Sequence, residues 1–417
     1  KPTGAPSPSP TTSPTDRPTT GRPSCPPTPA VTLVPAPNFN CRAGVECIQN
    51  SNFGDGDSCR YNIDLSLESV FQNTRNAYMS ARTRWMELIT GNLIPIPRSS
   101  LPNPDNCINL LPPVVDDLHI CGRDIAIDGQ GGVLGNAGTT YVRTPDPITG
   151  KQTTVTGVMN FDIADIPRLV QNGRWEAVIL HEMGHVVGIG TSWRRNNVVD
   201  ANNDYIGAAG INVWTNDWGC VSSAPPVEKD FGPGSRFVHW DEQCLRNEFM
   251  TPALSRTNPI SRLTIGTVED LGYEVDYDAA DPYNGTDTTC CFTSSVVPDP
   301  VTHPKLSDDG RAAAVAYGLQ LLRDNQLPDD IVVDVESSGV EYVGDRQVVV
   351  LYEEDGHIFD VPVTSEDMEP QLAATAEPTY VPTSVPTFAP TFVPTYVPTF
   401  VPTTEPTLLE EEENETI

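Results

Sequence analysis

Apolar residues in the central part of the chain recur with the period of a helix in two places. Residues 70–90 carry large apolar side chains at helical spacing, which are Tyr78, Ala81, Trp85, Leu88 and Ile89. Residues 174–187 carry a second such pattern, and Gly188 is placed to end that helix. Both patterns predict helices that turn one face towards a core.

Short apolar and β-branched runs predict strands around these helices. They are residues 61–65, 117–128, 139–143 and 158–162. The glycine-rich stretch 129–138 predicts a turn between two of them, and it lacks the G-K-[ST] of a phosphate loop. This order of elements predicts an α+β domain in which a helix packs against a twisted sheet.

Composition divides the chain into four parts. Residues 1–55 are mostly Pro, Thr and Ser, with a short cysteine-tied segment, and predict a disordered leader or linker. Residues 56–293 have globular composition. Residues 300–368 predict a small α+β module with a helix at 306–326 and strands at 331–335 and 347–352, and packing or spacing is its simplest role.

The fourth part, residues 369–417, contains a P-T-x-x repeat and an acidic end. Proline at every fourth position blocks both helix and sheet, so we expect an extended stalk. Its threonines are candidates for O-glycosylation, and its recurring aromatic residues are compatible with adhesion to a cell wall or glycan surface. A plain spacer is the alternative.

Charge and cysteine content restrict the class of protein. The net charge of −31 provides no basic footprint for nucleic acid. No apolar run reaches the length of a transmembrane helix. Ten cysteines without a C-x-x-C pair, and sequons at Asn284 and Asn414, predict a disulfide-bonded glycoprotein that is secreted or displayed at the cell surface. The first local pairings to consider are Cys107–Cys121 and Cys220–Cys244.

The second predicted helix contains the H-E-x-x-H pattern of His181, Glu182 and His185. Residues four apart share a helix face, so the two imidazoles can bind one Zn²⁺ ion. The intervening glutamate can then act as the general base on a water molecule. Two incidental histidines on a helix are the alternative.

A catalytic zinc site usually has three protein ligands. Gly188 matches the pattern H-E-x-x-H-x-x-G-x-x-H, but Thr191 stands where that pattern has its last histidine. His239 is the best candidate for the third ligand, because it lies shortly before Met250, which fits the methionine turn of metzincins. The carboxylates of Asp241, Glu242 and Glu248 are the alternatives.

Four segments together resemble the leishmanolysin-like metzincin zinc metalloproteases: HEMGHVVGIG, the displaced histidine of HWDE, the turn NEFMTP and the stretch SRLTIGTVEDLGY. The resemblance covers roughly residues 59–291. It implies a zinc endopeptidase with a smaller C-terminal subdomain across a cleft, acting on protein or peptide substrates.

By this resemblance His181, His185 and His239 bind one zinc ion, Glu182 is the base and Met250 forms the floor of the site. We expect the glycine-rich stretch that runs into residues 139–143 to be the edge strand that pairs with an extended substrate. Two alternatives remain, a catalytically inactive binding module on the same fold and a structural cell-wall or surface protein.

Overall fold

The structure of the protein, a computed structural model, describes a central body and leaves out both ends. The described residues are 45–48, 61–68, 70–101, 111–229, 236–254, 258–283, 289–292, 306–324, 340–342, 347–354 and 357–364. The proline-rich leader, the stalk, both sequons and the predicted strand at 331–335 lie outside them. The boundaries between the four predicted parts therefore stay predictions.

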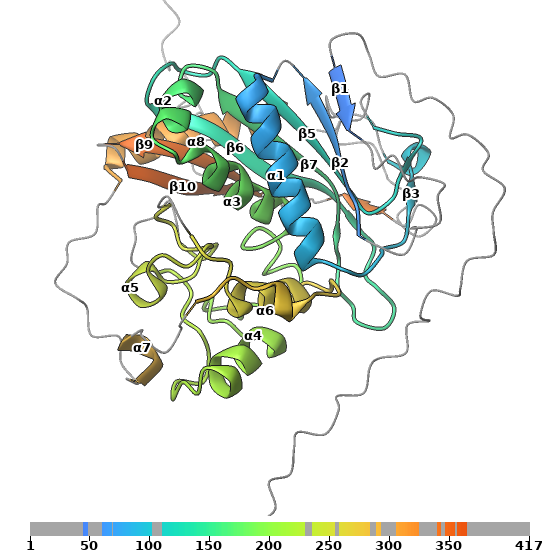
Figure 1. Cartoon of the computed structure of the whole chain (residues 1–417), viewed down its shortest axis with the longest axis vertical. Helices are drawn as coiled ribbons and strands as arrows, with labels where there is room; N and C mark the ends of the chain where they lie inside the picture. Colours follow the sequence, from blue (N-terminus) through green and yellow to red (C-terminus); the bar gives the residue numbers. More distant parts are fainter. Residues whose placement is uncertain are drawn as a thin grey trace, which may run out of the picture. The chain divides into compact units, whose positions relative to one another are not determined.

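One mixed sheet forms the centre of the molecule (Figure 1). Its spatial order is β1 (Val45–Ile48), β2 (Ile63–Glu68), β5 (Leu118–Ile125), β7 (Thr154–Asp162), β6 (Gly132–Arg143), β9 (Gln347–Glu354) and β10 (His357–Thr364), and β8 (Val340–Tyr342) also pairs with β6. Strands β2, β5 and β7 run parallel, whereas β6 runs antiparallel to β7. A two-stranded sheet of β3 (Ile96–Pro97) and β4 (Val114–Val115) stands apart from it.

Helices cover the sheet, so the predicted mixed α+β class is confirmed. The two longer helices on one face are α1 (Gln72–Leu88) and α3 (Trp175–Val187) (Figure 1). The others are α2 (Ile166–Gln171), α4 (Ala208–Asn212), α5 (Glu242–Leu245), α6 (Arg262–Asp270), α7 (Thr289–Phe292) and α8 (Asp308–Asp324), with short turns η1 (Arg98–Ser100), η3 (Val213–Asp217) and η4 (Tyr277–Ala279). None of the helices in the described ranges is both long and apolar enough to span a membrane.

The apolar faces of the two predicted helices pack against each other in the core. Trp85 of α1 is fully buried, and its indole N–H donates a hydrogen bond to the carbonyl of Leu180 on α3, at 3.1 Å. The two helices touch closely at Gly184, where an added Cβ would lie 3.0 Å from the Trp85 ring. Helix α1 thereby fixes the lateral position of α3 over the sheet.

Glycine and hydroxyl side chains hold the end of α3 against the sheet. A Cβ added to Gly157 of β7 would lie 2.4 Å from Cγ1 of Val186. The last carbonyls of a helix have no partner inside it. Here the hydroxyls of Thr139, Thr154 and Tyr273 donate to the carbonyls of residues 186 and 187 at 2.9–3.2 Å. The sheet thus sets the depth at which α3 lies.

The segment after residue 300 extends the central sheet. Strand β9 pairs with β6, and β10 continues as the last strand of the order. Side chains of Phe359, Val361 and Val363 form a buried cluster with α8. Strand alternation turns the residues between them to the opposite face, where α3 lies. The predicted helix and the strand at 347–352 are present, whereas β10 was not predicted.

Two expectations about the middle strands are wrong. The glycine-rich turn at 129–138 is shorter than expected, because β6 begins at Gly132. Glycine is needed inside this strand, since a Cβ on Gly135 would lie 2.4 Å from the carbonyl oxygen of Asn160 in β7. Residues 139–143 belong to β6 as expected, but β6 is not an edge strand, because β7 pairs on one side and β8 and β9 on the other.

The predicted pairing of Cys220 with Cys244 is also wrong. Cys220 is bonded to Cys291, and Cys244 is bonded to Cys290. Adjacent cysteines in α7 therefore tie down two separate points of the chain, one before and one after His239. Cys121 is disulfide-bonded, while Cys107 lies outside the described residues.

We predict that Gly157→Ala lowers the free energy of unfolding by about 1–3 kcal/mol, because the new methyl group overpacks the contact between β7 and α3. Thermal or urea unfolding measures the loss. Val186→Ala removes the colliding Cγ1, so the double variant should be more stable than the sum of the two single changes, by about 0.5–3 kcal/mol. Strict additivity would contradict this account of the glycine.

Candidate metal site

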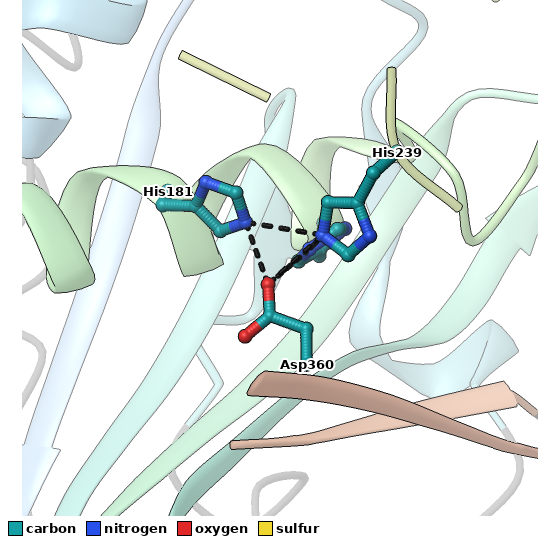
Figure 2. A group of neighbouring side chains, drawn as sticks. His181, His239 and Asp360 are labelled. Atoms are coloured by element: carbon teal, nitrogen blue, oxygen red, sulfur yellow. Dashed lines mark hydrogen bonds and ion pairs between the residues drawn. The ribbon is translucent and has the colours of Figure 1, made fainter. Parts of the chain in front are cut away.

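Three histidine side chains point at one another beneath α3. His181 and His185 are one turn apart on the helix, and His239 reaches them from the loop before α5 (Figure 2). The Nε2 atom of His239 lies 3.3 Å from Nε2 of His181 and 3.2 Å from Nε2 of His185. The structure therefore brings the three predicted ligands together, although His239 is far from the helix in sequence.

A fourth residue, Asp360 of β10, joins the three histidines (Figure 2). Its Oδ2 atom lies 2.8 Å from Nε2 of His181, 2.9 Å from Nε2 of His239 and 3.6 Å from Nε2 of His185. The sequence analysis missed this residue. The available signal was a single acidic position inside the apolar run IFDVPV, which strand alternation alone does not connect to a distant helix.

The backbone fixes which nitrogen of two histidines faces the cluster. Nδ1 of His181 lies 2.9 Å from the carbonyl oxygen of Phe249, and Nδ1 of His185 lies 2.9 Å from that of Ile189. A carbonyl can only accept, so both Nδ1 atoms carry the proton. Burial lowers the pKa of His185 to about 4, so this imidazole is neutral at pH 7. The Nε2 lone pairs therefore face the common point.

The Asp360 carboxyl is an anion in this setting. Burial raises its pKa, but the neighbouring histidines, His181 foremost, outweigh burial and hold the pKa well below the usual value. Four atoms that all offer lone pairs thus lie within 4.8 Å of one another in a buried place. Such an arrangement repels itself unless a shared proton or a metal ion lies between the atoms.

The spacing of the donor atoms fits a metal ion. A tetrahedral ion with metal–nitrogen distances of about 2.0–2.1 Å separates its ligand atoms by about 3.3 Å. The separations of 3.2 and 3.3 Å between the imidazole nitrogens agree with that value. Imidazole and carboxylate ligands suit divalent first-row transition metals. The four residues can therefore hold one such ion.

Glu182 lies beside the cluster but does not take part in it. Its side chain is fully buried, and neither carboxylate oxygen has a hydrogen-bond partner among the residues that the structure describes. Burial, and then the charge of Asp360, raise the pKa of Glu182 well above its usual value. A buried carboxyl without a partner is costly, and a polar molecule at the cluster would relieve that cost.

The turn around Met250 packs against α3, between the two histidines of that helix. Met250 is fully buried, and a Cβ added to Gly184 of α3 would lie 3.1 Å from its sulfur. Glu248 holds this turn, since it accepts hydrogen bonds from the N–H of Met250 and from the hydroxyls of Ser261 and Thr264, at 2.6–2.7 Å. The glycine of the HEMGH segment is required because the methionine lies directly against it.

The residues after α3 explain how the chain comes back to His239. Gly188 ends the helix with a φ of 124°, and Gly190 follows with a φ of 74°. A Cβ on Gly190 would lie 2.2 Å from the carbonyl oxygen of Val238, the neighbour of His239. Thr191 takes the position of the missing histidine and donates to the carbonyl of His185 at 2.6 Å. The two glycines allow the returning chain to pass against the helix end.

The alternative ligands are engaged elsewhere. Asp241 caps α5 by accepting from the N–H of Cys244, and Glu242 accepts from the N–H of Ala253. Glu248 serves the methionine turn. His119 lies in β5, where its Nε2 is 2.9 Å from the hydroxyl of Ser66, and it is not part of the cluster.

Comparison with known protein families covers the part of this site that α3 and His239 form. Residues 144–303 match the peptidase family described as Leishmanolysin. A search of curated proteins finds no match. The resemblance noted in the sequence is thereby confirmed, and the match indicates a metallopeptidase. The matched segment contains α3, His239 and the methionine turn, and it ends before Asp360.

We predict that His239→Ala weakens metal binding by at least about 100-fold, since even the loss of residues that only support metal ligands costs about 10–100-fold. Metal content after dialysis against a weak chelator, measured by elemental analysis, tests this. His119→Gln is the matched control, because it removes a buried histidine outside the cluster and should leave the content unchanged. Equal metal content in the His239→Ala chain would exclude His239 as a ligand.

Proposed function

We propose that the chain is a zinc-dependent endopeptidase of the metzincin class, with His181, His185 and His239 as zinc ligands and Glu182 as the general base. The observation that carries this proposal is the convergence of three buried imidazoles on one point, next to a buried carboxyl that has no hydrogen-bond partner in the described part of the chain. The family match over residues 144–303 supports the same reaction.

Zinc is the ion that this set of ligands favours. Three histidines are a common protein contribution to catalytic zinc sites. When bound, zinc polarises a carbonyl oxygen and makes a water molecule acidic enough to react near pH 7. The hydrogen bonds from Nδ1 of His181 and His185 to backbone carbonyls orient both rings and increase their basicity.

Glu182 carries the proton transfers. Its buried carboxyl is next to the imidazole ligands, where it can accept a proton from water and then release it. After the C–N bond of the substrate breaks, the protonated carboxyl can return the proton to the leaving amine. Met250 and Gly184 keep the floor of the site rigid, so that the carboxyl and the imidazoles stay aligned.

The remaining parts of the proposal concern substrate and location. The substrates are proteins or peptides, as for other metallopeptidases. The two disulfides through Cys290 and Cys291 suit an oxidising compartment, which supports a secreted or cell-surface protein. We also propose that α4 to α7 belong to the smaller C-terminal subdomain. The stalk is a spacer, with wall or glycan contact as its further role.

One observation favours a second function, a metal-binding protein without catalysis. Zinc sites with four protein ligands are usually structural, whereas catalytic sites keep one position open. Here Asp360 supplies a fourth donor atom. In this alternative Glu182 has no chemical task, and no form of the chain cleaves peptides.

We predict that Glu182→Ala lowers kcat/KM on labelled casein by at least about 100-fold, because the proton transfers lose their carboxyl. The change should be made in the wild-type chain and in an Asp360→Ala chain, with a zinc chelator abolishing activity in both. Glu176→Ala, an exposed glutamate on the same helix, is the matched control and should be neutral. Undiminished cleavage by the Glu182→Ala chain would refute the proposed mechanism.

A further inference from the structure

The candidate site is closed on every side. The side chains of His181, Glu182, His185, His239 and Asp360 all have 0% exposure. A peptide bond must reach the metal and Glu182 to be hydrolysed. In this conformation no substrate can do so, and part of the chain must first move away.

The segment that closes the site is the hairpin of β9 and β10. Strand β10 runs past the histidines and places the Asp360 carboxylate among them (Figure 2). Its neighbours Phe359 and Val361 point the other way and pack with α8. The alternation of the strand therefore serves two purposes, since one face anchors the hairpin and the other delivers the carboxylate.

The segment after residue 300 also covers the side of β6 that does not pair with β7. Strand β9 pairs with β6 from Gly132 to Ala137, and β8 pairs with it from Tyr141 to Arg143. A peptide substrate in an extended conformation would add to such a strand through main-chain hydrogen bonds. While β8 and β9 are in place, those backbone groups are already used.

A side-chain contact fastens this hairpin to the helical layer. Arg168 of α2 forms an ion pair with Glu353 of β9, and it also contacts Asp165 at 3.0 Å. Glu353 is largely buried. The hairpin is thus held at three places, by α8, by β6 and by α2, and the Asp360 contact with the histidines is a fourth.

From these contacts we propose that the hairpin β9–β10 is a built-in inhibitor, in which Asp360 takes the metal position that a water molecule needs and β9 takes the strand edge that a substrate needs. The proposal rests on the proposed peptidase function. Activation requires displacement of the hairpin, by cleavage of the chain after the catalytic part or by a partner that binds the hairpin.

The state of Glu182 distinguishes an inhibited enzyme from a permanently structural metal site. The carboxyl of Glu182 is fully buried, and no described residue donates a hydrogen bond to it. In a purely structural site this arrangement only costs stability. In an inhibited enzyme it is relieved when Asp360 leaves, because water then reaches both the metal and Glu182.

The test compares the full-length wild-type chain with Asp360→Ala and Asp360→Asn, each loaded with Co²⁺ as a spectroscopic substitute. Acetohydroxamate, a small metal-binding probe, is titrated and followed by the visible absorption of the cobalt. If the open form is less than about a tenth of the wild-type population, both variants should bind the probe at least about tenfold more tightly. Casein cleavage by the zinc-loaded variants should rise by a similar factor.

The matched control is His357→Ala, an exposed residue of the same strand, which should behave as wild type. Circular dichroism and the thermal midpoint show that each variant is folded, and Asp360→Asn keeps the size of the side chain if Asp360→Ala does not fold. Equal probe affinity in the wild-type and Asp360 chains would overturn the inhibitor proposal.

The two proposals fail in different ways. Tighter probe binding without any peptide cleavage, in every Asp360 variant, would mean that the hairpin closes the metal site but that the site is no peptidase. Cleavage by the wild-type chain at the rate of the Asp360 variants, with equal probe binding, would establish the peptidase and refute the inhibitor.

Discussion

The architecture of the metal site depends on bringing the ligand atoms of three histidines and Asp360 to one buried point. Two imidazoles can present Nε2 only because their Nδ1 atoms donate to the carbonyls of Phe249 and Ile189. Ile189 has its position because Gly188 turns the chain, and Phe249 has its position because Glu248 holds the methionine turn. Each ligand is therefore fixed by a backbone group that lies in a different segment of the chain.

The buried carboxylates differ in how well their hydrogen bonds are satisfied, and this difference separates structural from chemical roles. Asp270 accepts from the N–H groups of Ala209 and Gly210 and from the hydroxyl of Tyr205, and so ties the segment before His239 to α6. Glu248 is equally well satisfied within the methionine turn. Glu182 accepts nothing from the described residues. A buried polar group without partners is expensive, so such a group marks the place where the protein is prepared for another molecule.

Sequence predicted the parts of this site that are local or that follow a known pattern. The H-E-x-x-H spacing defines a helix face directly, and Thr191 in place of a histidine directed attention to His239. Asp360 could not be found in the same way, because its role depends on β10 pairing with β9 and on β9 pairing with β6. Pairing between distant strands is decided by the packing of the whole sheet rather than by local preference. The start of β6 could not be predicted for the same reason. Gly135 is needed there for a close contact with β7 and not for a turn.

The closed site and the peptidase sequence can be reconciled by considering which contacts the hairpin would lose on leaving. The free energy that holds it comes from the apolar contact with α8, the main-chain bonds to β6, the ion pair of Arg168 with Glu353 and the charge of Asp360 near the metal ligands. The contact with α8 lies within the segment after residue 300 and can persist when that segment moves as a unit, although Val133 of β6 belongs to the same buried cluster. The others are contacts with the remainder of the fold, and they would be lost when the hairpin leaves. Release of the hairpin would give water access to the buried Glu182 carboxyl, which has no hydrogen-bond partner among the described residues.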